Sequence, residues 1–400
     1  MTGNDKSLIM LHATSTLGRI LEQVPMLSFM RKILISLVAL LCLAALSTYA
    51  LWTAKRPSGH YLSDLRIQVD AVAGVPAQRG NLLGIQPELF PADYQSVQRL
   101  HLKLAGYLQQ ARERGLLGSK TVVVLPEHIG TWLWAVGEKN ELYQALHRRD
   151  AQQWLAASNP LRLLGGLVRA QGDDRFADAY LRMKASSMAD QYQQLFGGLA
   201  KEFAVTLVAG SIILPNPSVV DGQLHVASGP LYNTSLVFGA DGSTLGQPQL
   251  QHFTSHTTRR YVQPLGDVPF NVFDTPAGKL AVLIGTDSWH PASYARLQQQ
   301  DVQLLAVPAS VAGQGRWSSP WRGFRVSATP GDARLHPGEV SEAQAWLRLG
   351  DDSKAWASMT VFLRGHFWNQ FYEGQSFARQ NDRFGQVGDG RGARLINLWL

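Results

Sequence analysis

The 400-residue sequence contains only one cysteine, Cys42. This residue lies inside an uncharged apolar segment near the N-terminus, so the rest of the chain has no thiol. The main part of the protein therefore has no disulfide, no cysteine-ligated metal site and no cysteine nucleophile. The preceding Leu40-Leu41 pair is too bulky for a lipoprotein cleavage site, and we interpret Cys42 as an apolar residue of the segment.

Charged residues are also sparse, at 17% of the sequence, whereas hydrophobic residues make up 45%. A chain of this length and composition, without low-complexity tracts, can bury a large core. The net charge of +7 suits an anionic partner such as a membrane surface. The basic residues form no cluster interleaved with aromatic residues, and we expect no nucleic-acid partner.

The longest stretch without charge covers residues 33–52. At about 1.5 Å of rise per residue, a helix of this length crosses a hydrocarbon core of about 30 Å. We predict an uncleaved signal anchor or transmembrane segment at 33–52, preceded by an N-terminal tail at 1–32. Basic residues flank both ends and orient the helix only weakly, and we favour a cytoplasmic tail with an exported main domain.

A different start site would change this interpretation. Translation from Met30 would give a short basic region followed by an apolar region, which is the layout of a signal peptide. Cleavage near Ala50 would then release a secreted protein. The sequence leaves the choice between Met1 and Met30 open.

Beyond a linker at residues 53–63, segments with helical and strand patterns alternate through residues 64–400. Apolar residues recur at helical spacing over 92–114, and a buried strand is predicted at 121–125. The order strand, helix, strand recurs along the chain and predicts an α/β architecture with helices outside largely buried sheets. The other predicted helices are 188–203 and 293–300, and the other strands are 65–72, 205–213, 231–238, 271–274, 280–284 and 302–307.

Three further stretches carry weaker signals. Residues 135–187 resemble a helical insertion, which we interpret as a surface helical pair, with a membrane-touching helix as the alternative. Residues 325–350 are polar and resemble a second insertion. The aromatic-rich residues 362–372 are expected to form a core-packing helix.

Several predicted strands end in polar motifs. The strand at 121–125 is followed by Pro126-Glu127, and the strand at 205–213 contains Gly210-Ser211. The strand at 231–238 contains Tyr232-Asn233-Thr234, and an Asp241-Gly242 turn follows it. Residues 246–253 read GQPQLQHF, and residues 278–291 read GKLAVLIGTDSWHP.

In their order and spacing, these motifs resemble those of the nitrilase or carbon-nitrogen hydrolase superfamily over residues 64–400. The resemblance implies a four-layer αββα sandwich and commonly a homodimer. It also implies a Glu-Lys-Cys set in which the glutamate is the base, the lysine stabilises the oxyanion and the cysteine attacks the substrate. Only Glu127 is matched. Leu250 stands at the lysine position, and Gly285 stands at the cysteine position.

We therefore expect a degenerate family member that keeps a pocket for a small-molecule ligand, with no cofactor. The alternative is an active amidase or nitrilase that uses Ser288, Thr286 or a Glu127-activated water. A fatty-acyl transferase branch of the superfamily is a remote third alternative. Four histidines (His128, His252, His256 and His290) show no zinc-binding pattern, and no metal is expected. The expected pocket residues are Asp287, Trp289, His290 and Asn233.

Overall fold

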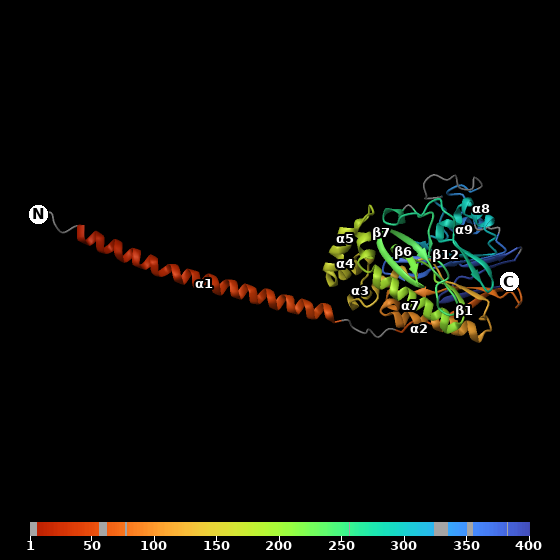
Figure 1. Cartoon of the computed structure of the whole chain (residues 1–400), viewed down its shortest axis with the longest axis horizontal. Helices are drawn as coiled ribbons and strands as arrows, with labels where there is room; N and C mark the ends of the chain where they lie inside the picture. Colours follow the sequence, from red (N-terminus) through yellow and green to blue (C-terminus); the bar gives the residue numbers. More distant parts are fainter. Residues whose placement is uncertain are drawn as a thin grey trace. The chain divides into compact units, whose positions relative to one another are not determined.

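The computed structural model describes residues 6–55, 62–76, 78–255, 257–323, 335–349, 355–381 and 383–400. The chain divides into two compact units, residues 1–56 and 57–400. The first unit is the helix α1 (Lys6–Ala54), drawn in red in Figure 1. Its Ser28–Ala54 part is long and apolar enough to cross a membrane, and it includes the predicted segment 33–52.

The second unit is built on two six-stranded sheets. In both sheets the central strands run parallel and the outer strands include antiparallel pairs. The first sheet has the order β1 (Ile67–Ala73), β19 (Ala393–Trp399), β2 (Asn81–Gln86), β4 (Thr121–Val124), β5 (Thr206–Val208) and β8 (Val237–Phe238). The second has the order β10 (Val272–Thr275), β11 (Gly278–Val282), β12 (Leu304–Ala309), β14 (Ala357–Phe362), β17 (Phe377–Gln380) and β18 (Arg383–Gln386).

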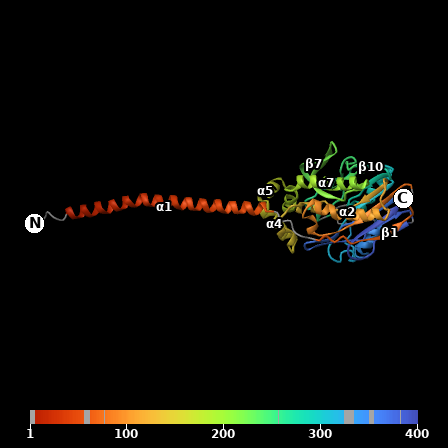
Figure 2. The ribbon, with the colours of Figure 1, turned by 90° about the horizontal axis from the view of Figure 1, so that it is seen from below.

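The two large sheets pack face to face because their strands are apolar on both sides. Val122 and Val124 of β4 belong to the same buried cluster as Val282 of β11 and Met359 of β14. The opposite face of the first sheet, which includes Val123, packs under helices α2 (Val97–Glu113) and α7 (Ala185–Phe203). These two helices lie side by side in Figure 2.

Helix α8 (Pro291–Gln299) covers the outer face of the second sheet. Tyr294 and Leu297 of α8 share a buried cluster with Leu283 and Leu305. Helix α9 (Glu342–Leu349) contributes Trp346 to a neighbouring cluster with Phe362. The layer order is therefore helix, sheet, sheet, helix, which confirms the predicted four-layer α/β sandwich.

Two smaller sheets and the insertion complete the unit. The small sheets consist of β13 (Val311–Ala312), β16 (Gln370–Glu373), β15 (Arg364–Phe367) and β3 (Glu88–Leu89), and of β6 (Ile212–Val220), β7 (Gln223–Ser235) and β9 (Gln249–Leu250). Residues 135–187 contain the helices α3 (Asn140–Gln144), α4 (Arg148–Ser158), α5 (Pro160–Arg169) and α6 (Arg175–Arg182). The single-turn helices are η1 (Pro91–Tyr94), η2 (Thr131–Ala135), η3 (Thr258–Arg260) and η4 (Gly285–Trp289).

Two local predictions are wrong. Residues 362–372 form the end of β14 and the hairpin β15–β16 instead of a helix, because aromatic residues also favour strands and Trp368 turns the chain at a φ of +56°. The predicted strand 205–213 is interrupted at Gly210, whose φ of +69° separates β5 from β6. Of the second predicted insertion, residues 325–334 and 350 lie outside the described residues, and the remainder includes α9.

Candidate functional site

Glu127 lies in the loop that leaves β4, three residues after the strand ends. Gly210 and Ser211 contact the backbone of this loop. A Cβ on Gly210 would lie 2.1 Å from the carbonyl oxygen of Pro126, so only glycine permits this close approach. The Ser211 hydroxyl accepts a hydrogen bond from the backbone N–H of His128 at 2.8 Å. The Gly-Ser motif therefore positions the loop that carries the acid.

The Glu127 side chain is buried and is held by two side-chain donors. Asn233 Nδ2, on β7, donates to Oε1 at 2.9 Å. Ser310 Oγ, immediately after β12, donates to Oε2 at 2.7 Å. His128 Nε2 lies 3.7 Å from Oε1. The carboxylate is thus fixed by residues that are far apart in the sequence.

Gly285 lies directly against this carboxylate. It follows β11 and begins η4 with a φ of +52°, a left-handed conformation that favours glycine. A Cβ on Gly285 would lie 2.8 Å from both carboxylate oxygens of Glu127. The structure therefore brings together two of the positions that the motifs predicted, and Gly285 has no side-chain atom with which to attack a substrate.

Leu250 and its neighbour Gln251 are placed differently. Leu250 is partly buried in β9, opposite Thr234 of β7. Gln251 is buried and lines the cavity beside Glu127. Its Oε1 accepts from Asn233 at 3.1 Å, and its Nε2 donates to the carbonyl oxygen of Ile284 at 2.9 Å. Beside the acid, the chain therefore presents an uncharged amide.

The two hydroxyls proposed as substitute nucleophiles do not bond to Glu127 in the described hydrogen bonds. Thr286 lines the cavity, but its hydroxyl donates to the carbonyl oxygen of Phe253. Ser288 is buried and donates to the carbonyl oxygen of Gly285 at 2.8 Å. The hydroxyl that does reach Glu127 belongs to Ser310, which the sequence analysis missed. Ser310 follows the predicted strand 302–307, but that strand and the strand before Glu127 belong to different sheets, so only the packing of the two sheets brings the residues together.

Asp287 lies behind the cavity wall and shapes η4. Its carboxylate accepts hydrogen bonds from the backbone N–H groups of Phe253, His252 and Ile284 at 2.7, 2.9 and 3.2 Å. Burial raises the pKa of Asp287 well above its ordinary value, although these backbone donors act in the opposite direction. Its role in the described structure is to tie the loop after β9 to the turn after β11.

The histidines near the site are also packing residues. His252 stacks on Phe270 with ring centroids 3.9 Å apart, and His290 stacks on Phe253 at 3.8 Å. Burial lowers the pKa of each of these two histidines to about 4, so both rings are neutral at pH 7. His256 lies outside the described residues. Within the described part of the chain, no three His, Cys, Asp or Glu side chains are grouped so that they could hold a metal.

The open space in front of Glu127 is a cavity of about 530 Å³. Trp289 lines it, whereas Asn233 contacts Glu127 without forming part of the described wall. No lysine is among its described lining residues. The other aromatic and charged lining residues are Tyr261, Trp346, Tyr372, His128, Arg148, Arg260, Arg316, Asp174 and Glu342.

The charges on the cavity wall are arranged unevenly. Arg316 Nη2 forms an ion pair with Glu342 at 2.7 Å, whereas the buried Nη1 of Arg316 has no hydrogen-bond partner among the described residues. Arg148 and Arg260 are exposed on the lining.

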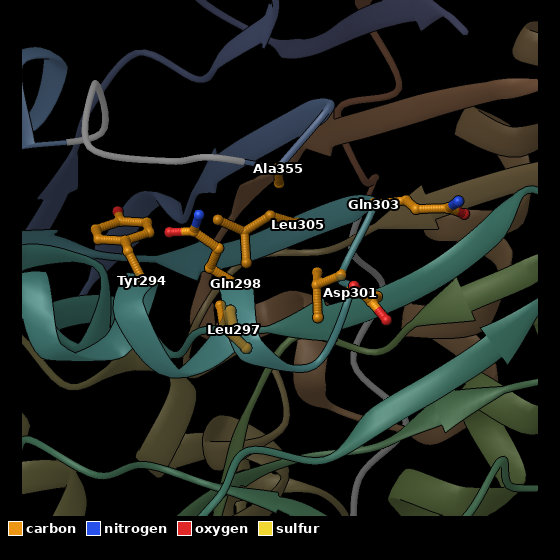
Figure 3. A pocket seen from close by; sticks show the side chains of 8 residues that line it. Tyr294, Leu297, Gln298, Asp301, Gln303, Leu305 and Ala355 are labelled. Carbon is orange, nitrogen blue, oxygen red and sulfur yellow. The ribbon is translucent and has the colours of Figure 1, made fainter.

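A separate hollow of about 330 Å³ lies between α8 and β12, with Tyr294, Gln298 and Asp301 on its wall (Figure 3). None of the residues around Glu127 line that second hollow.

Comparison with known proteins agrees with the fold. The carbon-nitrogen hydrolase from Helicobacter pylori G27 is 16% identical, with a TM-score of 0.50 over 80% of this chain and 88% of that chain. A double mutant of the amidase from Nesterenkonia sp. AN1, in complex with acrylamide, is 13% identical, with a TM-score of 0.47 over 82% of this chain and 93% of that chain. No curated protein sequence matches. The carbon-nitrogen hydrolase family model matches residues 86–326, more than half of the sequence, and the chain therefore belongs to the carbon-nitrogen hydrolase family.

Proposed function

We propose that this protein is a membrane-anchored, degenerate member of its family that keeps a ligand pocket and has lost hydrolysis. The observation that carries the proposal is the contact between Gly285 and Glu127. The base position is retained and held by Asn233 and Ser310. The position facing it has no nucleophilic atom, and its backbone comes so close that a Cβ would lie 2.8 Å from the carboxylate oxygens.

The missing cation supports the same proposal. Acyl transfer builds negative charge on the carbonyl oxygen, and removing one preorganised donor typically costs about 3–4 kcal/mol of transition-state stabilisation. Leu250 supplies no charge, and Gln251 donates from its amide nitrogen to the Ile284 carbonyl oxygen at 2.9 Å and to the Thr286 hydroxyl at 3.3 Å. Arg316 is paired with Glu342. A water activated by Glu127 would therefore attack a carbonyl without the lysine charge that the family resemblance places at the oxyanion.

The pocket is suited to binding instead. Glu127 offers acceptor oxygens to the cavity, whose wall also includes Trp289, Tyr261 and Tyr372. An amide-type small molecule would donate its N–H groups to Glu127 and place an apolar part against these rings. The amide-type ligand is thus retained from the ancestral chemistry as a binding partner.

A second candidate function is favoured by one observation, the 2.7 Å hydrogen bond from Ser310 to Glu127. A hydroxyl bonded to a carboxylate base is the arrangement of an activated serine nucleophile. In this alternative, Ser310 attacks the carbonyl carbon of an amide or ester, and its proton passes to Glu127 and then to the leaving group. This candidate has no lysine on the described cavity wall, where the cations are Arg148, Arg260 and Arg316.

A trapping experiment distinguishes the two candidates. Purified full-length protein is incubated with fluorophosphonate and activated-ester probes, and its intact mass and peptide map are measured. The proposal predicts no adduct on any peptide containing residues 285–288 or Ser310. An adduct on Ser310 that Glu127→Gln abolishes, while Ser288→Ala leaves it unchanged, would replace the proposal with the second candidate.

The membrane anchor is tested separately. The Ser28–Ala54 helix has the length and composition of a membrane span. Full-length protein should stay in the membrane fraction after alkaline carbonate extraction, with its main domain accessible from outside the cytoplasm. Leu40→Arg with Leu43→Arg should release it, because each arginine near the centre of a span costs about 2.5–3.5 kcal/mol. Retention of that variant in the membrane, or release of the unmodified chain, would contradict the anchor.

The expected homodimer is tested by the mass of the detergent-solubilised protein.

A further inference from the structure

Helix α5 exposes its apolar face, whereas an ordinary surface helix buries that face against the protein. Leu161 is 83% exposed, Leu164 60% and Val168 76%. The only buried residue of the helix is Gly166. At 100° per residue, the three apolar side chains fall on one stripe, and Gly166 lies on the opposite side. The helix therefore directs its apolar stripe away from the protein.

The packing of α5 explains this orientation. A Cβ on Gly166 would lie 2.5 Å from the carbonyl oxygen of Ala179 on α6, so the two helices approach through a position that only glycine allows. The Arg175 guanidinium donates to the carbonyl oxygen of Leu167 at 2.8 Å and ties the end of α5 to α6. The contacts of Gly166 and Arg175 between α5 and α6 therefore fix the helix with its apolar stripe facing outward.

Neighbouring helices add to the exposed apolar surface of the insertion. Trp154 on α4 and Phe176 on α6 are also exposed. Single exposed apolar residues are ordinary, but an apolar stripe with further aromatic residues in the same insertion indicates an interaction surface. Figure 1 shows α4 and α5 together at one end of the second unit.

The charge of the helix indicates the kind of surface that it meets. Arg162 and Arg169 are exposed on α5, and the helix contains no acidic residue. A short helix with an apolar stripe, flanking arginines and a nearby tryptophan is suited to the interface between lipid tails and anionic headgroups. A bilayer is within reach if the Ser28–Ala54 helix anchors the chain as proposed above.

We propose that the Leu161, Leu164 and Val168 face of α5 lies in the headgroup region of the membrane, with Arg162 and Arg169 on anionic lipids. This inference rests on the proposed anchor, but not on the loss of hydrolysis. It assigns the helical insertion a membrane-docking role that is separate from the span. Insertion helices α4 and α6 also contribute Arg148, Gln152 and Tyr180 to a hollow beside the Glu127 cavity, so docking would place that side of the pocket towards the lipid.

The test uses the full-length chain with Cys42→Ser, which removes its one thiol. Leu164→Cys carries a nitroxide label at the stripe, and Leu102→Cys carries it at a matched control on α2, where the leucine is 61% exposed. The protein is reconstituted in vesicles of phosphatidylglycerol and phosphatidylcholine. Collision rates of each label with oxygen and with a water-soluble nickel chelate are measured. We expect the label at 164 to be at least three-fold less accessible to the chelate than the label at 102, with higher oxygen accessibility.

Two results would overturn the inference. Equal chelate accessibility at the two positions would show that the stripe stays in water. Shielding at 164 with dipolar coupling between labels of two chains, unchanged when the anionic lipid is omitted, would show that the stripe binds a second copy. Carbonate extraction of the same vesicles separates the anchor from the docking, because an anchored chain with a water-accessible label at 164 contradicts the docking alone.

Discussion

The α-carbon of Gly285 faces the carboxylate of Glu127 so closely that a Cβ there would lie 2.8 Å from each oxygen. Asn233 and Ser310 hold the carboxylate from its two oxygens. The carboxylate of Glu127 therefore packs directly against the position that lacks a nucleophile. A side chain introduced at 285 would require the Glu127 carboxylate or the local backbone to shift.

The first prediction concerns this contact. Gly285→Ala should lower the free energy of unfolding by about 2–5 kcal/mol, because a left-handed φ costs about 1–2 kcal/mol and overpacking adds about 1–3 kcal/mol. Gly115→Ala is the matched control, since Gly115 has a φ of +68° and nothing within 4 Å of its added Cβ. Urea unfolding measures both variants. Equal losses in the two variants would mean that the contact with Glu127 adds nothing.

The second prediction concerns the neighbours Leu250 and Gln251. Gln251→Leu should cost about 2–4 kcal/mol, because it leaves the buried carbonyl of Ile284 without this donor and removes the bond from Asn233. Leu250→Gln should cost less than about 1.5 kcal/mol, since Leu250 is only partly buried. Urea unfolding of the two variants gives the order. The reverse order would show that residue 250 holds the site together.

The third prediction is a pH dependence of stability. His252 and His290 have a pKa of about 4 in the folded chain, below the value of 6.5 expected when unfolded. The unfolded chain therefore binds more protons between these values. The free energy of unfolding is therefore not reduced by these histidines above pH 6.5. It decreases as the pH falls from 6.5 towards 4, by up to about 1.4 kcal/mol per pH unit for each histidine.

This dependence is measured by urea unfolding at intervals from pH 7.5 to 4.5. Asp287 contributes the opposite slope in part of this range, because its raised pKa means that the folded chain loses stability as the pH rises. The informative quantity is therefore the difference between variants. His252→Gln should flatten the fall in stability relative to the unmodified chain, whereas His225→Gln, at an exposed position, should leave it unchanged. Parallel curves for both variants would contradict the prediction.

The sequence supported more of this site than composition alone would allow. Strand 121–125, the Pro126-Glu127 end and the motif around Gly285 could be ordered by resemblance, and the fold places Glu127 against Gly285. The contact between Ser310 and Glu127 could not be anticipated in this way. It joins residues 183 positions apart, and only the packing of two sheets brings their loops together.

Side-chain direction and element type were harder to predict. The motif alignment assigned the lysine position to Leu250, but adjacent residues of an extended chain point to opposite sides, and Gln251 is the one that reaches Asn233. Residues 362–372 have aromatic side chains that suit a core helix or a buried strand equally. The hairpin turn at Trp368 and pairing with neighbouring strands decide for the strand.

The most direct test of the central claim is ammonia or acid release by the purified full-length protein on a panel of amides, nitriles and esters. If hydrolysis is lost, release by the unmodified chain equals that by Glu127→Gln and stays at the background of the buffer, and Gly285→Cys does not raise it. Release that clearly exceeds the background and disappears in Glu127→Gln would contradict the account.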